Sequence, residues 1–193
     1  MTNKKSKKVA IITGATGNIG YDIVSKLGEA GFITIGLDRT PPSIDHPVFE
    51  TDLNLFINSP EIQNEFMEFC QPYCEQADEI SLINNAAIQI TGNLISLTID
   101  EITRSLNVNA IAPFLLSQLL VNKYEEKLLT IINISSIHSR LTKVNFGAYA
   151  MSKASLSALT RSLSLEIGHK TRVCEIQPAA IDTDMLRAGL QDE

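Results

Sequence analysis

A glycine-rich turn between two apolar segments near the N-terminus constrains the fold of this chain most strongly. The run Val9–Ile12 is short and rich in β-branched residues, which indicates a buried strand, and Ile19, Ile23 and Leu27 follow at helical spacing. Glycines let the backbone approach a pyrophosphate, and the free N–H groups at the start of the helix bind its charge. The strand, turn and helix therefore predict a dinucleotide site, although loops also use glycine for steric reasons alone.

An acid ends the next apolar run, Phe32–Leu37, where a dinucleotide fold binds the adenosine ribose. Asp38 would accept hydrogen bonds from the ribose hydroxyls and repel a 2′-phosphate. This favours NAD(H) as the cofactor. NADP(H) is the alternative, since the guanidinium of Arg39 could bind that phosphate if it turned inward.

Apolar strands and amphipathic helices alternate along the rest of the chain. Further strands are predicted at 48–51, 80–83, 129–134 and 172–176, and further helices begin near Pro60, Asp100 and Tyr149. Because each strand is apolar on both faces, we expect an α/β fold with a Rossmann-type, doubly wound parallel sheet covered on both sides. Residues 1–8 are expected to form a flexible basic tail, and residues 9–193 a single dinucleotide-binding domain that carries the active site.

Several local features refine this expectation. Pro72 should end or kink the helix that begins near Pro60, and Pro113 should make a later helix irregular. Asn84 and Asn85 end a strand, so both amides are expected on the ligand side of the sheet.

Charge and hydropathy exclude two classes of partner. A net charge of −6 disfavours nucleic acid, which is bound by clustered Lys and Arg. No apolar run approaches the ~20 residues that span a bilayer, so no membrane partner is expected. The lysines near the N-terminus precede no apolar segment and do not resemble a signal peptide, so we expect a cytoplasmic protein.

The three cysteines do not form a convincing metal site. Cys70 and Cys74 are close in sequence, but no further Cys or His completes a ligand set, and Cys174 is remote. Buried free thiols are the expected state, and no metal is expected.

Tyr149 and Lys153 stand four residues apart at the start of a predicted helix, so they share one of its faces. A neighbouring ammonium lowers the pKa of a phenol toward the range in which it acts as a base. The same spacing also occurs by chance, so the pair gains weight only from the dinucleotide motif that accompanies it.

Together these motifs resemble the short-chain dehydrogenase/reductase family, in its single-domain oxidoreductase branch, from Val9 to about Leu190. The resemblance implies an NAD(P)-dependent oxidoreductase that acts on a small-molecule alcohol or ketone. It implies four catalytic residues, Asn109, Ser136, Tyr149 and Lys153. The implied cofactor-binding residues are Thr13, Gly14, Thr16, Gly17, Asn18, Ile19, Gly20, Asp38, Arg39, Asp52, Leu53, Asn85, Ala86, Ala87, Ile134, Tyr149, Lys153, Pro178, Ala179, Ile181 and Thr183.

The chemistry of these side chains suggests a role for each. Tyr149 would exchange a proton with the substrate oxygen, while Lys153 would lower the pKa of the phenol and hold the nicotinamide ribose. Ser136 would donate a hydrogen bond to the same oxygen, a role for which Ser135 is disfavoured by strand alternation and spacing. By the family analogy, Asn109 would hold a water in a proton relay.

The same resemblance indicates where a substrate would bind. Its expected contacts are Gln89, Ser136, His138, Arg140 and Phe146. A His and an Arg favour a polar or anionic substrate, with solvated surface residues as the alternative interpretation.

Three departures from the family pattern leave other functions open. The spacing of Gly17 and Asn18 resembles the sugar-nucleotide-acting branch, and Ala179 stands where glycine is usual. The chain ends at Glu193 and is C-terminally short for the family. The alternatives are therefore a sugar-nucleotide-modifying enzyme, or an inactive cofactor-binding module or fragment.

Two long helices carry more apolar residues than one buried stripe requires, so we expect part of their surface to face a second copy. The family pairs through the same helices, which implies a homodimer or homotetramer. The residues concerned are Leu115, Leu116, Leu119, Leu120, Val121, Leu156, Leu159, Leu163 and Leu165.

Overall fold

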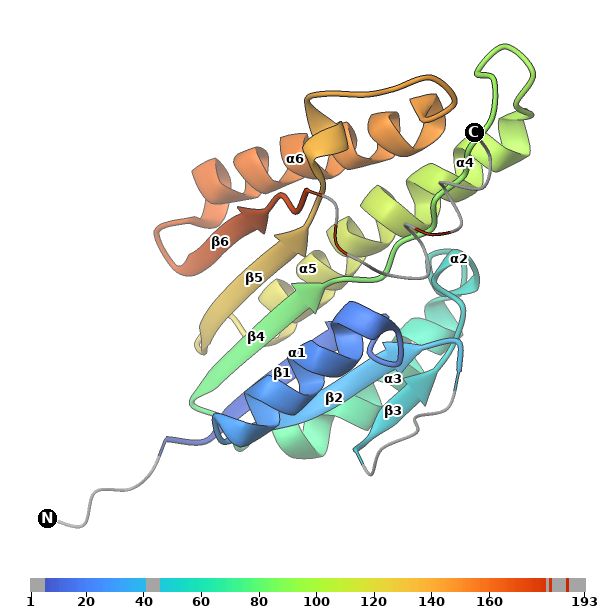
Figure 1. Cartoon of the computed structure of the whole chain (residues 1–193). Helices are drawn as coiled ribbons and strands as arrows, with labels where there is room; N and C mark the ends of the chain where they lie inside the picture. The colour runs from blue at the N-terminus through green and yellow to red at the C-terminus, as the bar shows by residue number, and fades with distance from the viewer. Residues whose placement is uncertain (1–5, 41–45, 180, 182–186, 188–193) are drawn as a thin grey trace, which may run out of the picture.

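Six parallel strands form one sheet in the order β3–β2–β1–β4–β5–β6 (Figure 1). The computed structural model describes residues 6–40, 46–179, 181 and 187. The strands are β1 Lys8–Thr13, β2 Phe32–Asp38, β3 Val48–Glu50, β4 Glu79–Asn84, β5 Leu128–Ile134 and β6 Thr171–Ile176. From β1 the chain moves outward to β3 and then returns to β4, which leaves a crevice at the carboxyl ends of β1 and β4. The predicted α/β, doubly wound, single-domain fold is confirmed.

Helices connect the strands. They are α1 Asn18–Glu29, α2 Leu53–Phe56, α3 Pro60–Cys74, α4 Ile99–Leu106, the π-helix η1 Asn107–Ile111, α5 Ala112–Lys123, the short 3-10 turn η2 Ile137–Ser139 and α6 Gly147–Ile167. The sequence did not predict α2, because four residues carry too little periodicity to be recognised.

The two faces of the sheet have separate cores. On one face α1 packs through Val24 against Ala10, Ile12 and Ile83. On the other face α3 and α5 bury a larger cluster, which includes Phe66. Figure 1 shows α1 in front of the sheet and α3 and α5 behind it.

Helix α6 lies on the same face as α5. Ile131 and Asn133 are two residues apart on β5, so their side chains point to the same face of the sheet. Ile131 belongs to the larger core on the α5 face. Asn133 Nδ2 donates to Thr160 Oγ1 on α6 at 2.8 Å, which places α6 on that face as well. Cover on both faces was expected along the whole sheet. Among the described residues, however, β6 exposes Cys174 and half of Ile176 on the α1 face.

Capping residues set the helix starts. Ser59 accepts from the Ile62 N–H at 3.3 Å and Pro60 occupies the first turn of α3, as the sequence predicts. Pro72 was expected to end or kink this helix, but α3 continues to Cys74. Because Pro72 lies in the last turn, its missing N–H removes only one late helical bond.

The irregularity expected from Pro113 lies just before it. Residues Asn107–Ile111 form a π-helix, and Pro113 sits in the first turn of α5, where a missing N–H is tolerated. A π-turn inserted in a helix is often found at functional sites. It carries the fully buried Asn109.

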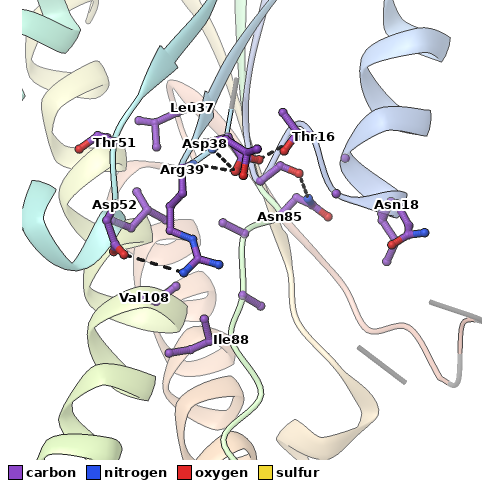
Figure 2. Close-up of a pocket in the computed structure, with 18 of the residues that line it drawn as sticks. Thr16, Asn18, Leu37, Asp38, Arg39, Thr51, Asp52, Asn85, Ile88 and Val108 are labelled. Atoms are coloured by element: carbon purple, nitrogen blue, oxygen red, sulfur yellow. Dashed lines mark hydrogen bonds and ion pairs between the residues drawn. The ribbon is translucent and has the colours of Figure 1, made fainter. Parts of the chain in front are cut away.

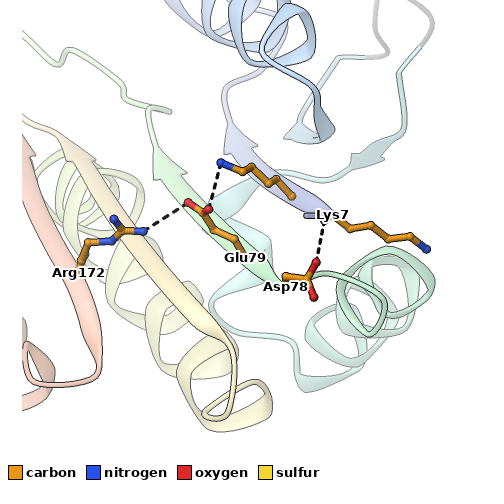
Figure 3. A network of polar contacts seen from close by, with 5 residues as sticks. Lys7, Asp78, Glu79 and Arg172 are labelled. Carbon is orange, nitrogen blue, oxygen red and sulfur yellow. Dashed lines mark hydrogen bonds and ion pairs between the residues drawn. The ribbon is translucent and has the colours of Figure 1, made fainter. Parts of the chain in front are cut away.

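Polar contacts join the amino ends of three strands, away from the crevice (Figure 3). Glu79 on β4 pairs with Lys8 Nζ at 3.4 Å and with Arg172 Nη2 on β6 at 3.5 Å. The Lys7 N–H donates to Asp78 Oδ2 at 2.8 Å. Such pairs near the surface contribute little stability.

The long helices bury part of the surface that was expected to face a partner. Leu116, Leu120 and Leu156 belong to the interior and are at most 1% exposed, so they are not available for assembly. Phe114 and Leu165 on α5 and α6 remain exposed. In the described part of the chain, no helix combines the length and the apolar character needed to cross a bilayer.

Candidate active site

A cavity of about 340 Å³ lies at the carboxyl ends of β1, β2 and β4 (Figure 2). It brings together most of the residues predicted for the adenosine and pyrophosphate side of the cofactor: Gly14, Thr16, Gly17, Asn18, Ile19, Gly20, Asp38, Arg39, Asp52, Leu53, Asn85, Ala86 and Ala87. Sequence reasoning missed six further lining residues, Leu37, Thr40, Thr51, Ile88, Arg104 and Val108. These contribute through position alone and carry no motif that could have identified them.

The glycine turn is closely packed against the start of the loop after β4. Gly14 has φ +65°, and a Cβ on it would lie 2.9 Å from the Cα of Ala86. The buried Thr13 Oγ1 accepts from the N–H groups of Asn85 at 3.0 Å and Ala86 at 2.9 Å. Asn85 Nδ2 donates to the carbonyls of Thr13 and Gly14, each at 3.1 Å. Thr13 therefore holds the wall of the cavity without lining it.

The first turn of α1 suits an anion. Gly17 caps the helix without a side-chain hydrogen bond, and the first turn carries no acidic residue. A Cβ on Gly20 would lie 1.9 Å from the Gly14 carbonyl oxygen, so only glycine permits this approach of turn and helix. These features fit the pyrophosphate of a dinucleotide.

The acid predicted for the ribose is in place and held by the backbone. Asp38 Oδ2 accepts from the Thr16 N–H at 2.9 Å, and Oδ1 accepts from the Arg39 N–H at 2.6 Å. The Arg39 guanidinium extends toward Asp52, with Nη1 3.9 Å from Oδ2 (Figure 2). Asp52 also caps α2, accepting from the Asn54 N–H at 2.7 Å.

Ser136, Tyr149 and Lys153 form a second group that does not line this cavity. All three are at least nine-tenths buried. Ser136 hydrogen-bonds to the phenol of Tyr149. Lys153 Nζ donates to the Ile134 carbonyl at 2.8 Å and lies 5.8 Å from the centre of the Tyr149 ring. The carboxyl end of β5 thus positions the lysine beside the tyrosine.

Burial dominates the ionisation of this pair. Burial raises the pKa of Tyr149, and the hydrogen bond from Ser136 opposes that change only in part. Burial lowers the pKa of Lys153 to about 8, against the opposing charge of Glu175. A lowering of the Tyr149 pKa by Lys153 stays a prediction.

Asn109 lies between the two groups. Its amide bonds both backbone groups of Ile88, a residue that lines the cavity, and donates to Ser152 Oγ on α6 at 2.9 Å. Ser135 is used differently from Ser136, because its hydroxyl donates to the backbone carbonyl of Lys153 at 3.3 Å.

Asn84 does not face the ligand side, and that prediction was wrong. Its Nδ2 donates to Asn133 Oδ1 at 2.7 Å inside the sheet, where both amides are buried. The side chains of neighbouring strand residues point to opposite faces, so of the doublet only Asn85 reaches the cavity.

The residues predicted for substrate contact lie on the Tyr149 side. His138 stacks on Phe146 with ring centres 4.8 Å apart and meets Tyr149 edge-on at 5.9 Å. Burial, aided by the charge of Lys143, lowers the pKa of His138, which favours the neutral imidazole. Arg140 directly follows η2 and is exposed, and Gln89 is half-buried in the segment after β4.

The residues predicted beside the nicotinamide are only partly described. The Pro178 carbonyl accepts from the Ile137 N–H at 3.0 Å, which places it next to η2. Ala179 and Ile181 are exposed and outside the cavity, and Thr183 lies outside the described residues.

Comparison with known proteins identifies relatives over nearly the whole chain. The family model described as short chain dehydrogenase matches residues 8–193. Carbonyl reductase [NADPH] 2 of Sus scrofa is 28% identical over 95% of this chain and 75% of that protein. The 3-oxoacyl-[acyl-carrier-protein] reductase FabG of Pseudomonas aeruginosa is 31% identical over 93% of this chain and 76% of its own length.

Solved structures agree with this assignment. A 4-hydroxyisoleucine dehydrogenase complexed with NADH has a TM-score of 0.82 and 29% identity, covering 96% of this chain and 81% of its own. The ligand-free aldohexose dehydrogenase of Thermoplasma acidophilum has a TM-score of 0.86 and 26% identity, covering 97% of this chain and 72% of its own.

Proposed function

Because this chain belongs to the short chain dehydrogenase family, we propose that it is an oxidoreductase that moves hydride between NAD(H) and an alcohol or ketone, with Tyr149 as its acid and base. The observation that carries the proposal is the buried group of Ser136, Tyr149 and Lys153 beside a cavity shaped for a dinucleotide. A bound nicotinamide supplies the acceptor of a hydride or, in the reverse direction, its donor.

In the direction of oxidation, the Tyr149 phenolate accepts the proton of the substrate hydroxyl. The hydrogen on the carbon that bears this hydroxyl leaves with its electron pair as a hydride. The carbonyl double bond forms as the O–H bond breaks. Ser136 holds the substrate oxygen near the phenol and stabilises the charge that develops there. Reduction follows the same steps in reverse, with protonated Tyr149 as the donor.

Lys153 supports this proton transfer. Its ammonium favours the phenolate and provides donors for the hydroxyls of the nicotinamide ribose. Asn109 keeps the segment after β4 and helix α6 together, so that cavity and catalytic group hold one relative position.

As the cofactor, we propose NAD(H) in preference to NADP(H). The Asp38 carboxylate, fixed by the N–H groups of Thr16 and Arg39, presents negative charge where a 2′-phosphate would sit. The Arg39 guanidinium could bind that phosphate, but it lies close to the Asp52 carboxylate, whose negative charge offsets its positive charge.

For the substrate, we propose a small polar alcohol or ketone, since Phe146, His138 and Arg140 offer a ring face, a donor and a cation on the Tyr149 side. We also propose that the chain assembles as a homodimer or homotetramer through the exposed apolar residues of α5 and α6.

Two measurements test the function. Titration of the fluorescence of NADH and NADPH gives the affinity for each cofactor. A panel of alcohols, ketones, sugars and nucleotide sugars, followed at the absorbance of the reduced nicotinamide, gives turnover. We expect NADH to bind more tightly than NADPH and at least one alcohol or ketone to be turned over. A protein that binds NADH yet turns over nothing in the panel is a cofactor-binding module, and one that turns over only nucleotide sugars belongs with that branch.

A further inference from the structure

A carboxylate on β6 contacts the catalytic helix at a point that the mechanism above does not use. Glu175 accepts a hydrogen bond from Ser157 Oγ, and Ser135 and Gln177 also bond to it. Gln177 Nε2 in addition donates to Ser157 Oγ at 3.5 Å. Burial alone would raise the pKa of Glu175. These hydrogen bonds and the charge of Arg140 lower it by more than burial raises it, so the net pKa lies below the usual value and the group is a carboxylate.

This cluster adjoins Lys153. Ser157 follows Lys153 by one helical turn, so the two share a face of α6. Ser135 bridges them, since its hydroxyl donates to the Lys153 carbonyl at 3.3 Å and lies 3.2 Å from Ser157 Oγ. Glu175 therefore sits on the same side of α6 as the lysine, anchored by a serine from α6 and a serine that follows β5.

Few other charges face Lys153. On its own helix the neighbour is Tyr149. His138 of η2 meets the Tyr149 ring, and Arg140, which follows η2, acts on Glu175. Strand β5 and the π-helix carry no titratable residue, and the charged residues of α4 are exposed. Among the described residues packed around the lysine, Glu175 is thus the carboxylate that acts on it.

We propose that Glu175 is a positioning residue of the active site, whose carboxylate supports the ammonium form of Lys153 from strand β6. The inference rests on the proposed function, in which that ammonium assists Tyr149 and binds the nicotinamide ribose. Burial alone pushes Lys153 toward the neutral amine, which would neither favour the phenolate nor donate as strongly. The Glu175 carboxylate opposes this loss of charge.

The direct test is the titration of Lys153 in the free chain. Lysine labelled with 13C at Cε is followed by NMR against pH, and the Lys153 signal is assigned with Lys153→Arg. We expect a midpoint near 8 in the parent and a midpoint about half a pH unit lower in Glu175→Gln. The glutamine keeps an acceptor for Ser157, so a merely structural role of Glu175 would leave the midpoint unchanged.

Three variants sharpen this result. Glu175→Asp restores the charge and should return the midpoint to the parent value. Glu166→Gln makes the same chemical change on an exposed residue near the end of α6 and should not move it. Ser157→Ala removes the hydrogen bond that holds the Glu175 carboxylate against α6 and should lower the midpoint, which keeps the proposal testable if Glu175→Gln does not fold.

NADH affinity against pH provides the second readout. In the parent, affinity should fall as pH rises through the Lys153 midpoint, and in Glu175→Gln the fall should begin about half a unit lower. Identical Lys153 midpoints in parent and Glu175→Gln overturn the inference. A parent that shows no NADH binding overturns the proposed function instead, so the two failures are distinguishable.

Discussion

Asn109 bonds both backbone groups of Ile88, with its Oδ1 2.9 Å from the N–H and its Nδ2 2.8 Å from the carbonyl oxygen. Its amide also reaches Ser152 on α6, so one buried side chain joins a wall of the cavity to the catalytic helix. The π-turn provides this geometry by placing Asn109 where the regular helix is interrupted.

Replacing Asn109 with Leu should therefore be costly for stability. The variant keeps the volume but removes both partners of the half-buried Ile88 backbone and the donor to Ser152, which keeps only its bond to the Tyr149 carbonyl, so we expect the free energy of unfolding to fall by about 3 kcal/mol. Urea denaturation followed by circular dichroism measures it. The control is Asn107→Leu in the same π-turn, which loses only the half-buried bond to Asn54. Equal losses in both variants would show that the Ile88 bonds carry no special weight.

The sequence predicted the strands and helices of this fold better than the local details that depend on contacts between them. Apolar segments identified all six strands and the main helices, because burial leaves a readable pattern. The π-helix was not predicted as such, since Asn109 on it bonds to Ile88, and a contact between residues so distant in the chain leaves no local pattern. The direction of Asn84 also depends on a partner, Asn133, on the next strand.

The candidate site shows the same division. The glycine turn and Asp38 were predictable because a motif links residue type to chemistry at fixed spacing. Arg104 and Val108 line the cavity only because α4 and the π-helix pass beside it, which no local pattern records. Glu175 was overlooked for a similar reason, since its relation to Lys153 runs across a strand and a helix.

Tyr149→Phe should abolish turnover and preserve cofactor binding, because it removes only the hydroxyl that carries the proton. We expect kcat to fall by at least about 100-fold, with NADH affinity unchanged. Lys153→Ala should reduce both, since the ammonium serves the phenol and the ribose. Tyr73→Phe on α3 is the matched control and should resemble the parent. Substantial turnover in Tyr149→Phe, on any substrate that the parent accepts, would rule out the assigned acid/base.

Asp38→Asn should weaken the preference for NADH over NADPH. The asparagine oxygen can still accept from the Thr16 N–H, while the bond from the Arg39 N–H and the charge that repels a 2′-phosphate are lost. We expect the ratio of the two affinities to change by about tenfold toward NADPH, a difference of about 1.4 kcal/mol. Fluorescence titration with both cofactors measures it. A parent that already prefers NADPH contradicts the role given to Asp38.

Lys153 should give the chain a stability that rises with pH above neutrality. Its pKa falls from 10.5 to about 8 on folding, because burial disfavours the charge. The unfolded chain therefore binds more protons between these values, and the free energy of unfolding increases through this window by up to about 3 kcal/mol.

The non-titrating variant Lys153→Met isolates this contribution. Urea denaturation of parent and variant at several pH values gives the difference between their free energies of unfolding, which should grow in favour of the parent from pH 8 upward. Subtraction removes the shared effect of the buried Cys74 thiol, whose pKa burial raises to about 11. Lys123→Met, at an exposed position at the end of α5, is the control. If the difference for Lys153→Met stays constant across this pH window, folding does not lower the pKa of Lys153.

The chain should sediment as a dimer or larger at micromolar concentration. Although several helix leucines turned out to be interior, Phe114 on α5 is 44% exposed and Leu165 on α6 is 88% exposed, which leaves apolar surface on both helices. Monomers rarely expose such surface over more than a few hundred Å².

Phe114→Glu places a charge on this face and should shift the equilibrium toward monomer, because a buried unpaired carboxylate is costly at an interface. Leu94→Glu, at a 56% exposed position before α4, is the matched control and should leave assembly unchanged. A parent that sediments as a clean monomer contradicts the proposed assembly.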